Sequence, residues 1–349
     1  MDSARGWRGG QNQVLLTAKG MERRGHEVVV VCRNGSALRD RARAADLDVR
    51  PIPFGGDLVP APALALRQLA RRFRAEVVHV HDPHAAAAAL WIGSSSRLFA
   101  SRRVDFALRG PLSRWKYRRC RRVIAVSRAV ARVLEGDGLP SASVRVVYEG
   151  VPDRPAAAGG EEALRALGVP AGAPVVGNVA ALTAHKDHAT LLAAAARVIA
   201  RVPDARFVIV GQGELESRLR TQAFELGLEG RVVFAGFRSD VDLLLPAFDV
   251  FCLSSHMEGL GTSLLDAMCY ARAVVGTSAG GIPEAVEDGV TGRVVPPRQP
   301  EALAAALTEV LLDRGRREAM GRAGRGRFLE RFTADRMVEE TLAVYGEAA

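Results

Sequence analysis

Lysine, cysteine and aromatic residues are scarce in this chain of 349 residues, and long apolar runs are absent. The four cysteines, Cys32, Cys120, Cys252 and Cys269, are scattered without metal-ligand or redox spacing, so neither a disulfide framework nor a zinc finger is expected. No apolar run approaches the roughly 20 residues that a membrane-spanning helix needs. No signal peptide is recognisable near Met1, and a reduced cytoplasmic setting fits these observations.

Acidic residues are also fewer than basic ones, 39 against 48, which gives a formal net charge of +9. This balance favours acidic partners such as phosphates, nucleic acid or an anionic membrane surface. The only lysines are Lys19, Lys116 and Lys186, and all the other residues in the combined count of lysine and arginine are arginines. The bias towards arginine and alanine indicates genome composition more than function.

Short apolar runs alternate with longer helical patterns through most of the chain. Val77–His81 and Val250–Leu253 read as strands, for example, and His188–Arg201 reads as a helix. Such alternation is typical of the α/β class, in which parallel sheets carry helices on both faces.

The composition shifts near Gly150–Gly160, where proline, alanine and glycine predict a linker. We therefore expect two doubly wound, Rossmann-like domains that face a cleft, at residues 1–155 and 156–330. A C-terminal helix at residues 331–349 is expected to pack back towards the first domain.

The N-terminus is unusual for this fold class. Gly9 and Gly10 look like a glycine loop that enters a helix at Gln11 or Asn12, and such a loop normally follows a strand. Residues 1–8 do not read as a strand. We therefore expect either that the N-terminal sheet lacks its first strand or that the true start lies upstream of Met1.

Glu258–Asp266 is the most informative segment, because a strand precedes it and a helix, Leu264–Ala271, overlaps its end. A strand, a turn at Gly261 and a helix start together make an anion site. The first helical N–H groups have no intrahelical partner, and the helix dipole is positive there. Glu258 is expected in the loop at the carboxyl end of a strand, the edge that faces the ligand crevice in open α/β sheets.

Asp266 has a second interpretation. Ser263 and Asp266 match a capping box, in which the acidic side chain bonds back to the N–H of the cap residue. This structural role alone would explain Asp266, and the pattern does not decide between the two.

Other strand ends carry candidate ligand contacts. Lys186 lies between a strand that ends near Ala181 and a helix that starts after Asp187, where a compact ammonium suits a phosphate oxygen. A solvated surface lysine is the alternative. Gly211 and Gly213 also follow a strand and fit the wall of a nucleotide pocket, but such turns are common and the signal is weak.

Polar residues also gather in the first half of the chain. His79 and His81 share one face of a strand, and Asp82 follows them. Zinc is conceivable, but no distant fourth ligand has a recognisable spacing, so an acceptor crevice or a packing role is favoured. Arg103 and Asp105 follow the next strand-like segment and are expected at the same crevice.

A basic segment occupies residues 97 to 132, with twelve basic residues and one acid, and with Trp115 and Tyr117 interleaved. Such a surface can dock on anionic lipid or on nucleic acid, and a solvated arginine face is the third interpretation. No recognisable nucleic-acid motif accompanies it. We therefore expect no nucleic acid partner and a possible peripheral membrane contact at Arg114–Arg122.

Taken together, these residues resemble the retaining glycosyltransferases of the family 4 type, which have the GT-B fold. The resemblance runs over nearly the whole chain. It rests on Gly9–Val28, Val78–Asp82, Glu149–Val151, Glu258–Met268 and Gly280–Glu284. The family pattern in the most specific part is a Glu, seven residues and a second Glu.

The chain departs from this pattern at several positions. Asp266 stands where the second Glu is usual, which implies a shorter or water-mediated ribose contact. Ala181 stands where an Arg commonly accompanies the Lys, so less charge would hold the diphosphate. Arg103 lies near a position where many members carry a His.

The resemblance implies a glycosyltransferase that uses a nucleotide diphosphate sugar and needs no obligatory metal or other cofactor. Glu258, Lys186 and Arg103 would be the catalytic residues. The implied donor-binding residues are Gly10, Lys186, Gly211, Gly213, Glu258, Gly259, Leu260, Gly261, Thr262, Ser263 and Asp266. The implied acceptor-side residues are His81, Asp82, Arg103 and Asp105. A lipid-linked or envelope glycan is the expected acceptor, on the inner face of the cytoplasmic membrane.

Other function classes stay open. An NAD-dependent oxidoreductase needs Gly-x-Gly-x-x-Gly after a first strand, but Gly211 and Gly213 are followed by Glu216 instead of the third glycine. A protein that binds a nucleotide sugar without turning it over would be compatible with the altered positions, because a protein can keep its fold and lose its catalytic activity. A glycosidase is less favoured, since Glu258 and Asp266 would serve one donor instead of flanking a sugar bond.

Overall fold

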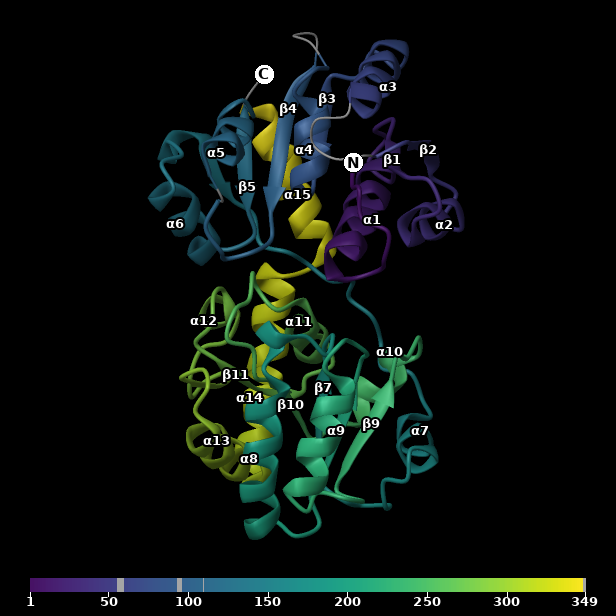
Figure 1. The fold of residues 1–349 in the computed structure, drawn as a ribbon. Coiled ribbons are helices and arrows are strands. Elements are labelled where there is room, and N and C mark those ends of the chain that lie inside the picture. Colours follow the sequence, from purple (N-terminus) through teal and green to yellow (C-terminus); the bar gives the residue numbers. More distant parts are fainter. Residues whose placement is uncertain (55–59, 93–95, 109, 348–349) are drawn as a thin grey trace. The chain divides into compact units, whose positions relative to one another are not determined.

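The protein is described by a computed structural model that covers residues 1–54, 60–92, 96–108 and 110–347 (Figure 1). The chain divides into two compact units. Unit 1 comprises Met1–Val151 and Thr333–Ala349, and unit 2 comprises Pro152–Phe332. The boundaries fall after residues 151 and 332, where the sequence predicted 155 and 330.

Unit 1 alternates strands and helices. Its strands are β1 (Val29–Arg33), β2 (Asp48–Ile52), β3 (Val77–Val80), β4 (Arg97–Arg102), β5 (Arg122–Ala125) and β6 (Val144–Val146). Its helices are α1 (Gly9–Glu22), α2 (Ala37–Arg43), α3 (Pro60–Arg72), α4 (Pro83–Ala89), α5 (Gly110–Arg118), α6 (Arg128–Gly136), the 3-10 turn η1 (Ser141–Ser143) and α15 (Ala334–Gly346). The paired strands run parallel, as the alternation predicted.

The sheet of unit 1 is divided into two parts, β2–β1 and β3–β4–β5–β6. The first residues of the chain connect them. The Asp2 N–H donates to the Val31 carbonyl at 3.0 Å, and on the other side the Met1 amine donates to the His79 carbonyl at 2.8 Å. The His81 N–H then donates to the Met1 carbonyl at 3.0 Å. The prediction of a missing first strand is confirmed, because no strand precedes β1 in residues 1–28, and only an isolated bridge at Asp2 lies in that strand's place.

Helix α1 begins earlier than predicted. Gly9 and Gly10 are its first two residues, so they do not form a separate loop ahead of Gln11. The Arg8 N–H donates to the Gln11 side chain at 3.2 Å, which stabilises the helix start in the manner of a capping box.

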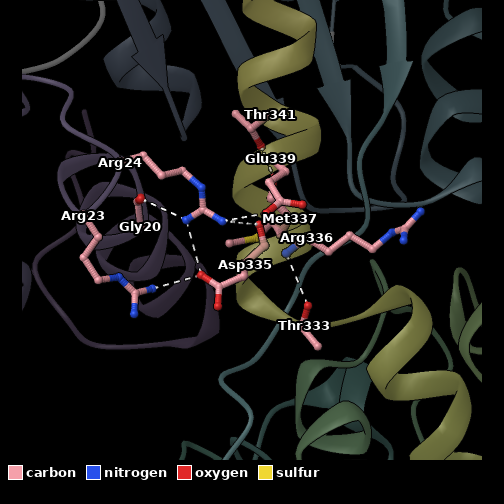
Figure 2. Close-up of polar contacts among 9 residues, drawn as sticks. All are labelled: Gly20, Arg23, Arg24, Thr333, Asp335, Arg336, Met337, Glu339 and Thr341. Atoms are coloured by element: carbon pink, nitrogen blue, oxygen red, sulfur yellow. Dashed lines mark hydrogen bonds and ion pairs between the residues drawn. The ribbon is translucent and has the colours of Figure 1, made fainter.

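Helix α15 packs against α1 within unit 1. Gly20 makes this close approach possible, because a Cβ at that position would lie 2.5 Å from a methyl carbon of Val338. At the edge of the contact, Arg24 donates to Glu339 at 2.9 Å and to Asp335 at 3.3 Å (Figure 2). The C-terminal segment is thereby fixed to the first helix of the chain.

Unit 2 is a second doubly wound unit. Its strands are β7 (Val175–Val179), β8 (Arg206–Val210), β9 (Val232–Gly236), β10 (Val250–Leu253), β11 (Ala273–Thr277) and β12 (Gly292–Val295). Its helices are α7 (Gly160–Ala166), α8 (His188–Arg201), α9 (Glu216–Glu225), α10 (Val241–Leu244), α11 (Thr262–Cys269), α12 (Ile282–Ala285), α13 (Pro300–Leu312) and α14 (Arg314–Arg331), with the 3-10 turns η2 (Ala184–Lys186) and η3 (Leu245–Ala247).

One continuous parallel sheet runs through unit 2 in the order β12–β11–β10–β7–β8–β9. Strands β10 and β11 are buried along their whole length, as expected for strands that helices cover on both faces. Helix α13 lies beside α8 (Figure 1). Among the helices of the described residues, none is both long and apolar enough to cross a bilayer.

Candidate functional site

The order of strands in unit 2 marks where a ligand should bind. Chain order runs from β7 outwards through β8 to β9, and then from β10 outwards to β12 on the other side. The direction therefore reverses between β7 and β10. In open α/β sheets the crevice outside the carboxyl ends of the strands at this switch point is the usual ligand site.

Lys186 and Glu258 lie at this switch point. Lys186 ends the turn η2 after β7, and Glu258 lies in the loop after β10. The Lys186 Nζ donates to Glu258 Oε2 at 2.5 Å, and the two side chains are 18% and 13% exposed. The Ser255 hydroxyl donates to the same oxygen at 3.2 Å. The sequence predicted both charged residues at the site but not their pairing.

Hydrogen bonds hold the two loops together. The His256 N–H donates to the His185 carbonyl at 2.9 Å, and the Ser254 hydroxyl donates to the Lys186 carbonyl at 3.0 Å. A third loop joins them, because the Gly281 N–H donates to the Glu258 carbonyl at 3.3 Å. The loops after β7, β10 and β11 are thus joined by hydrogen bonds, which fixes the position of the ion pair.

Helix α11 begins directly after this loop. Gly261 precedes it as the N-cap with φ +92°, a left-handed conformation that favours glycine. The helix starts at Thr262, two residues before the predicted Leu264, so Thr262 and Ser263 lie in its first turn and are not the cap. Their N–H groups point along the helix axis without intrahelical acceptors, next to Glu258. Gly259 and Leu260 complete the turn, and Leu260 is buried.

Asp266 is held by an arginine. The Arg154 Nη2 donates to Asp266 Oδ1 at 2.8 Å, and the Arg154 Nη1 donates to Asp242 Oδ2 at 2.5 Å. The capping-box interpretation of Asp266 is therefore wrong, since its partner is Arg154 and the cap is Gly261. Burial raises the pKa of Asp266 to about 6, against the opposing effect of Arg154. No spacing in the sequence connects Arg154 to this carboxylate, so sequence reasoning missed it.

Gly211 and Gly213 have a packing role that the sequence did not indicate. A Cβ on Gly211 would lie 1.9 Å from the Ala180 carbonyl oxygen, and one on Gly213 would lie 2.3 Å from the Leu182 carbonyl oxygen. The Leu182 N–H also donates to the Gln212 carbonyl at 3.1 Å. These glycines let the loops after β7 and β8 run in contact, and their predicted role in donor binding stays a prediction.

In unit 1 the predicted acceptor-side residues lie at the carboxyl ends of β3 and β4. The Arg103 Nε donates to Glu149 Oε1 at 2.8 Å, and the Arg103 Nη1 lies 3.0 Å from the His81 Nδ1. The side chains of Arg103 and Glu149 are only 14% and 9% exposed. Burial lowers the pKa of His81 well below its usual value, so this ring is neutral and can accept from Arg103.

The remaining predicted residues of unit 1 surround this pair. Asp82 caps α4, since its Oδ1 accepts from the N–H groups of His84 and Ala85 at 2.9 Å. Gly10 lies next to Arg103, because a Cβ there would be 3.8 Å from the Arg103 Cδ. Asp105 follows β4 and is half-buried.

In both units the Asp-x-Asp pattern, a candidate for metal binding, is engaged with an arginine. The chain contains two Asp-x-Asp triplets, Asp46–Asp48 and Asp240–Asp242. Asp48 pairs with Arg50 at 2.7 Å, and Asp240 pairs with Arg238 at 2.6 Å. Within residues 1–54, 60–92, 96–108 and 110–347, no group of three or more His, Cys, Asp or Glu side chains is arranged to hold a metal ion.

Two family models match the chain. The model described as "Glycosyl transferases group 1" matches residues 160–327, and the model described as "Glycosyltransferase Family 4" matches residues 7–154. A 2-deoxystreptamine N-acetyl-D-glucosaminyltransferase of Streptomyces fradiae is 31% identical, over 97% of this chain and 90% of the relative. A GDP-mannose-dependent alpha-(1-6)-phosphatidylinositol monomannoside mannosyltransferase of Mycobacterium tuberculosis is also 31% identical, over 84% of this chain and 82% of the relative.

Solved structures agree in fold. The Anabaena protein Alr3699/HepE, crystallised with UDP and glucose, superimposes with a TM-score of 0.85 at 23% identity, over 99% of this chain and 98% of that one. A glycosyltransferase from Rickettsia africae superimposes with a TM-score of 0.86 at 19% identity, over 99% and 97%. The two doubly wound units and these superpositions show that the chain has the GT-B fold. The chain belongs to the family 4, group 1 type of glycosyltransferases.

Proposed function

We propose that this glycosyltransferase moves a sugar from a nucleotide diphosphate sugar to a glycan or lipid-linked acceptor with retention of configuration. The observation that carries the proposal is the Lys186–Glu258 pair at the β7–β10 switch point, beside the start of α11. An ammonium and the first helical amides suit a diphosphate, and a carboxylate suits sugar hydroxyls. The UDP and glucose bound by the Anabaena relative support this ligand class.

The proposed chemistry depends on charge that builds up on the leaving group. When the sugar departs, negative charge develops on the nucleoside diphosphate, and donors fixed in advance stabilise it. Lys186 carries three N–H donors, so it can bond to a phosphate oxygen while Glu258 still accepts one of them. The N–H groups of Thr262 and Ser263 supply further donors, and the proposal assigns no step to a metal or other cofactor.

Asp266 is proposed to accept hydrogen bonds from the hydroxyls of the ribose. Arg154 holds one of its oxygens, which orients the carboxylate, and the other oxygen is proposed to face the nucleotide. An aspartate is one methylene shorter than the glutamate usual in the family. We therefore propose a ribose contact that passes through a water.

The acceptor is proposed to contact unit 1 at His81, Asp82, Arg103 and Asp105, and Gly10 is proposed to contact the donor. Relatives differ in acceptor. The name of the Mycobacterium tuberculosis relative includes a phosphatidylinositol monomannoside, and that of the Streptomyces fradiae relative includes 2-deoxystreptamine. A lipid-linked or envelope acceptor is favoured here by the basic, aromatic surface of unit 1.

That surface centres on α5. Leu112 is 53% exposed and Trp115 is 47% exposed, and Arg114, Arg118 and Arg119 are exposed around them. Arginines with apolar side chains between them suit the headgroup region of an anionic membrane. We propose a peripheral contact at Arg114–Arg122 on the inner face of the cytoplasmic membrane. Lys116 is buried and donates to the Pro83 carbonyl at 3.3 Å, so it takes no part.

Vesicle sedimentation tests this contact. The triple variant Arg114→Glu, Arg118→Glu, Arg119→Glu is expected to lose binding to vesicles that contain anionic phosphatidylglycerol. A matched triple variant on the exposed arginines Arg201, Arg218 and Arg220 of unit 2 should retain it. Equal binding by both variants would refute a membrane contact at α5.

The activity is tested by supplying the purified chain with UDP- and GDP-sugars. A thermal-shift screen should identify a donor, and release of nucleoside diphosphate should follow when that donor meets extracts of lipid-linked glycans. The anomeric configuration of the product, measured by NMR, decides retention. Donor binding without any release would favour a non-catalytic nucleotide-sugar binder instead.

A further inference from the structure

A cavity of about 750 Å³ lies in unit 2, at the amino ends of its central strands. It is lined by Val175 at the start of β7, by Asp249 directly ahead of β10 and by Ala273 at the start of β11. Residues of α7 and of the start of α14 also line it. This volume lies within the range of about 300–1,000 Å³ that is typical of binding sites for small molecules.

The cavity is separate from the candidate donor site. Lys186 and Glu258 follow the carboxyl ends of β7 and β10, whereas the cavity lies at the amino ends of the same strands. These strands have five and four residues and rise by about 15 Å, so the two places are at opposite edges of the sheet. A ligand in the cavity would therefore not compete directly with a nucleotide at Lys186.

Arg272 brings a positive charge to this cavity. Its Nε donates to the Tyr270 carbonyl at 3.0 Å, and its Nη1 donates to the Phe248 carbonyl at 3.5 Å. Within the part of the chain that the structure describes, its Nη2 makes no hydrogen bond and its guanidinium makes no ion pair. A guanidinium stays charged at physiological pH, so both N–H donors of this nitrogen are available to a ligand.

A second guanidinium lies near Arg272. Arg317, whose side chain is 17% exposed, pairs with Asp249 at 3.2 Å. Both oxygens of Asp249 are engaged, because the other one accepts from the Val175 N–H at 2.9 Å. Burial lowers the pKa of Arg272, the charge of Asp249 opposes this shift, and the charge of Arg317 adds to it. An anion beside Arg272 would offset both the burial and the repulsion.

The rest of the lining combines a small excess of positive charge with apolar side chains. Four arginines and three carboxylates line the cavity. Among these carboxylates, Glu318 pairs with Arg314 at 2.8 Å, and Glu161 is exposed. Leu164 of α7 and Val169 in the following loop are buried and line the cavity as well. A ligand here would therefore contact both a guanidinium and apolar side chains.

We propose that this cavity binds a small organic anion. The phosphate or carboxylate group of the ligand accepts from the Nη2 of Arg272, because a guanidinium forms strong charge-assisted hydrogen bonds to either group. The apolar part of the ligand packs against Leu164 and Val169. This inference goes beyond the proposed transfer of a sugar and does not rest on it, since it uses no residue of the donor or acceptor sites.

Three probes of similar size test the proposal by titration calorimetry: phenyl phosphate, benzoate and the neutral benzyl alcohol. We expect the better anion to bind with a Kd of about 1 mM or below, as a ligand of this size allows, and at least about tenfold more tightly than the alcohol. The anion that binds more tightly identifies the charged group. On binding, the methyl NMR signals of Leu164 and Val169 should move, and those of Leu264 in α11 should not.

Four variants locate the binding. Arg272→Gln should weaken it at least about tenfold, and Arg201→Gln, on an exposed arginine of α8, should leave it unchanged. Ala171→Trp, at an exposed position of the lining, should block the cavity and leaves Arg272 in place, so it also covers the case in which Arg272→Gln does not fold. Lys186→Ala should bind the anion like the wild type, whether or not the proposed donor site exists.

Three results would overturn the proposal. Binding that is lost in Lys186→Ala but kept in Arg272→Gln and Ala171→Trp would assign the probes to the donor site. Equal affinity for benzyl alcohol and both anions would mean that the cavity does not select charge. Absence of binding by every probe would mean that the cavity takes no ligand of this class.

Discussion

Units 1 and 2 each place a cation–carboxylate pair at the carboxyl edge of a parallel sheet, and the two pairs differ in how they are held. In unit 2, Lys186 donates to Glu258 from a flexible side chain with a compact ammonium. In unit 1, Arg103 is held from two directions, by Glu149 at 2.8 Å and by His81 at 3.0 Å. A planar guanidinium fixed at two points keeps one orientation, whereas an ammonium can turn to a ligand without leaving its partner.

The surroundings of the two pairs differ in the same sense. Glu258 is followed by the left-handed Gly261 and the open first turn of α11, which leaves donors for a ligand. Further side chains pack near Arg103, since the His79 Nδ1 lies 2.6 Å from the Tyr345 hydroxyl and the His79 Nε2 lies 2.8 Å from the Ser101 hydroxyl. Two pairs of similar burial therefore differ in how many neighbouring side chains fix their cation.

Replacing Glu258 should give the largest effect. Glu258→Gln keeps the shape and a carbonyl acceptor for Lys186 but removes the charge that the proposal assigns to the sugar hydroxyls. We expect kcat to fall at least about 100-fold, comparable to the loss of one preorganised polar contact in other active sites, with the melting temperature changed by less than about 3 °C. Steady-state release of nucleoside diphosphate measures this. Glu229→Gln, an exposed residue of unit 2, is the control, and wild-type turnover in Glu258→Gln would remove Glu258 from the site.

Replacing Arg103 should mainly lower the stability of the fold, whereas replacing Lys186 should mainly weaken nucleotide binding. Arg103→Ala removes a largely buried guanidinium that donates to Glu149 and lies 3.0 Å from the His81 Nδ1, so we expect a loss of about 3 kcal/mol in the free energy of unfolding. Lys186→Ala should cost only about 1 kcal/mol but weaken nucleoside diphosphate binding about 10- to 100-fold, because a charge-assisted contact to phosphate is lost. Urea unfolding and titration calorimetry measure the two quantities. If Lys186→Ala were the more destabilising variant, or bound the nucleotide normally, the contrast between the two pairs would be wrong.

A buried histidine in unit 2 should make stability depend on pH. The His188 Nε2 lies 3.0 Å from the Asn178 Oδ1, and burial lowers the pKa of His188 from 6.5 to about 4. The unfolded chain therefore takes up a proton at a pH where the folded chain does not, so stability should fall as the pH drops from about 6.5 to 4, by about 3 kcal/mol in total. His188→Gln keeps a donor for Asn178 and should flatten this dependence.

Asp266, also in unit 2, should contribute a pH dependence of stability that is opposite in sign to that of His188. Its pKa is raised from 3.8 to about 6, so its protonated form favours the folded state and that stabilisation is lost as the pH rises from about 4 to 6. Asp266→Asn should therefore steepen the loss of stability on the acid side, while His188→Gln should reduce it. Unfolding curves between pH 4 and 7 measure both, and identical slopes in the two variants would contradict the assigned titrations.

The sequence predicted the fold and the strand ends of the site because both depend on local patterns. Alternating apolar runs specify a doubly wound unit, and the turn around Gly261 specifies a helix start after a buried strand. Glu258 and Lys186 could be selected because each follows a strand directly. Their contact depends on β7 and β10 being neighbours, which the reversal of strand order produces and which no short pattern shows.

Contacts between distant segments explain what the sequence did not predict. Arg154 lies 112 positions before Asp266, and no periodicity connects them. Gly211 and Gly213 look like ligand-facing turns, but their immediate contacts are the backbones of Ala180 and Leu182. The sequence indicated an absent first strand, whereas the bridge that Met1 and Asp2 make between β1 and β3 depends on tertiary pairing.

The contact between α1 and α15 should give the smallest effect and extends the comparison to surface charges. Arg24 is 25% exposed, but its partners Asp335 and Glu339 are 62% and 66% exposed, so solvent screens the attraction. We expect Arg24→Ala to cost about 0.5–1 kcal/mol in the free energy of unfolding, and Arg23→Ala, whose side chain is 64% exposed, to cost less. Urea unfolding in 0.05 and 0.5 M NaCl measures this, and the difference between wild type and Arg24→Ala should shrink in high salt. A loss above about 2 kcal/mol would mean that ion pairs, and not the packing of Val338 against Gly20, hold the C-terminal helix in place, and that exposed pairs in this chain carry as much weight as the buried pair of Arg103 and Glu149.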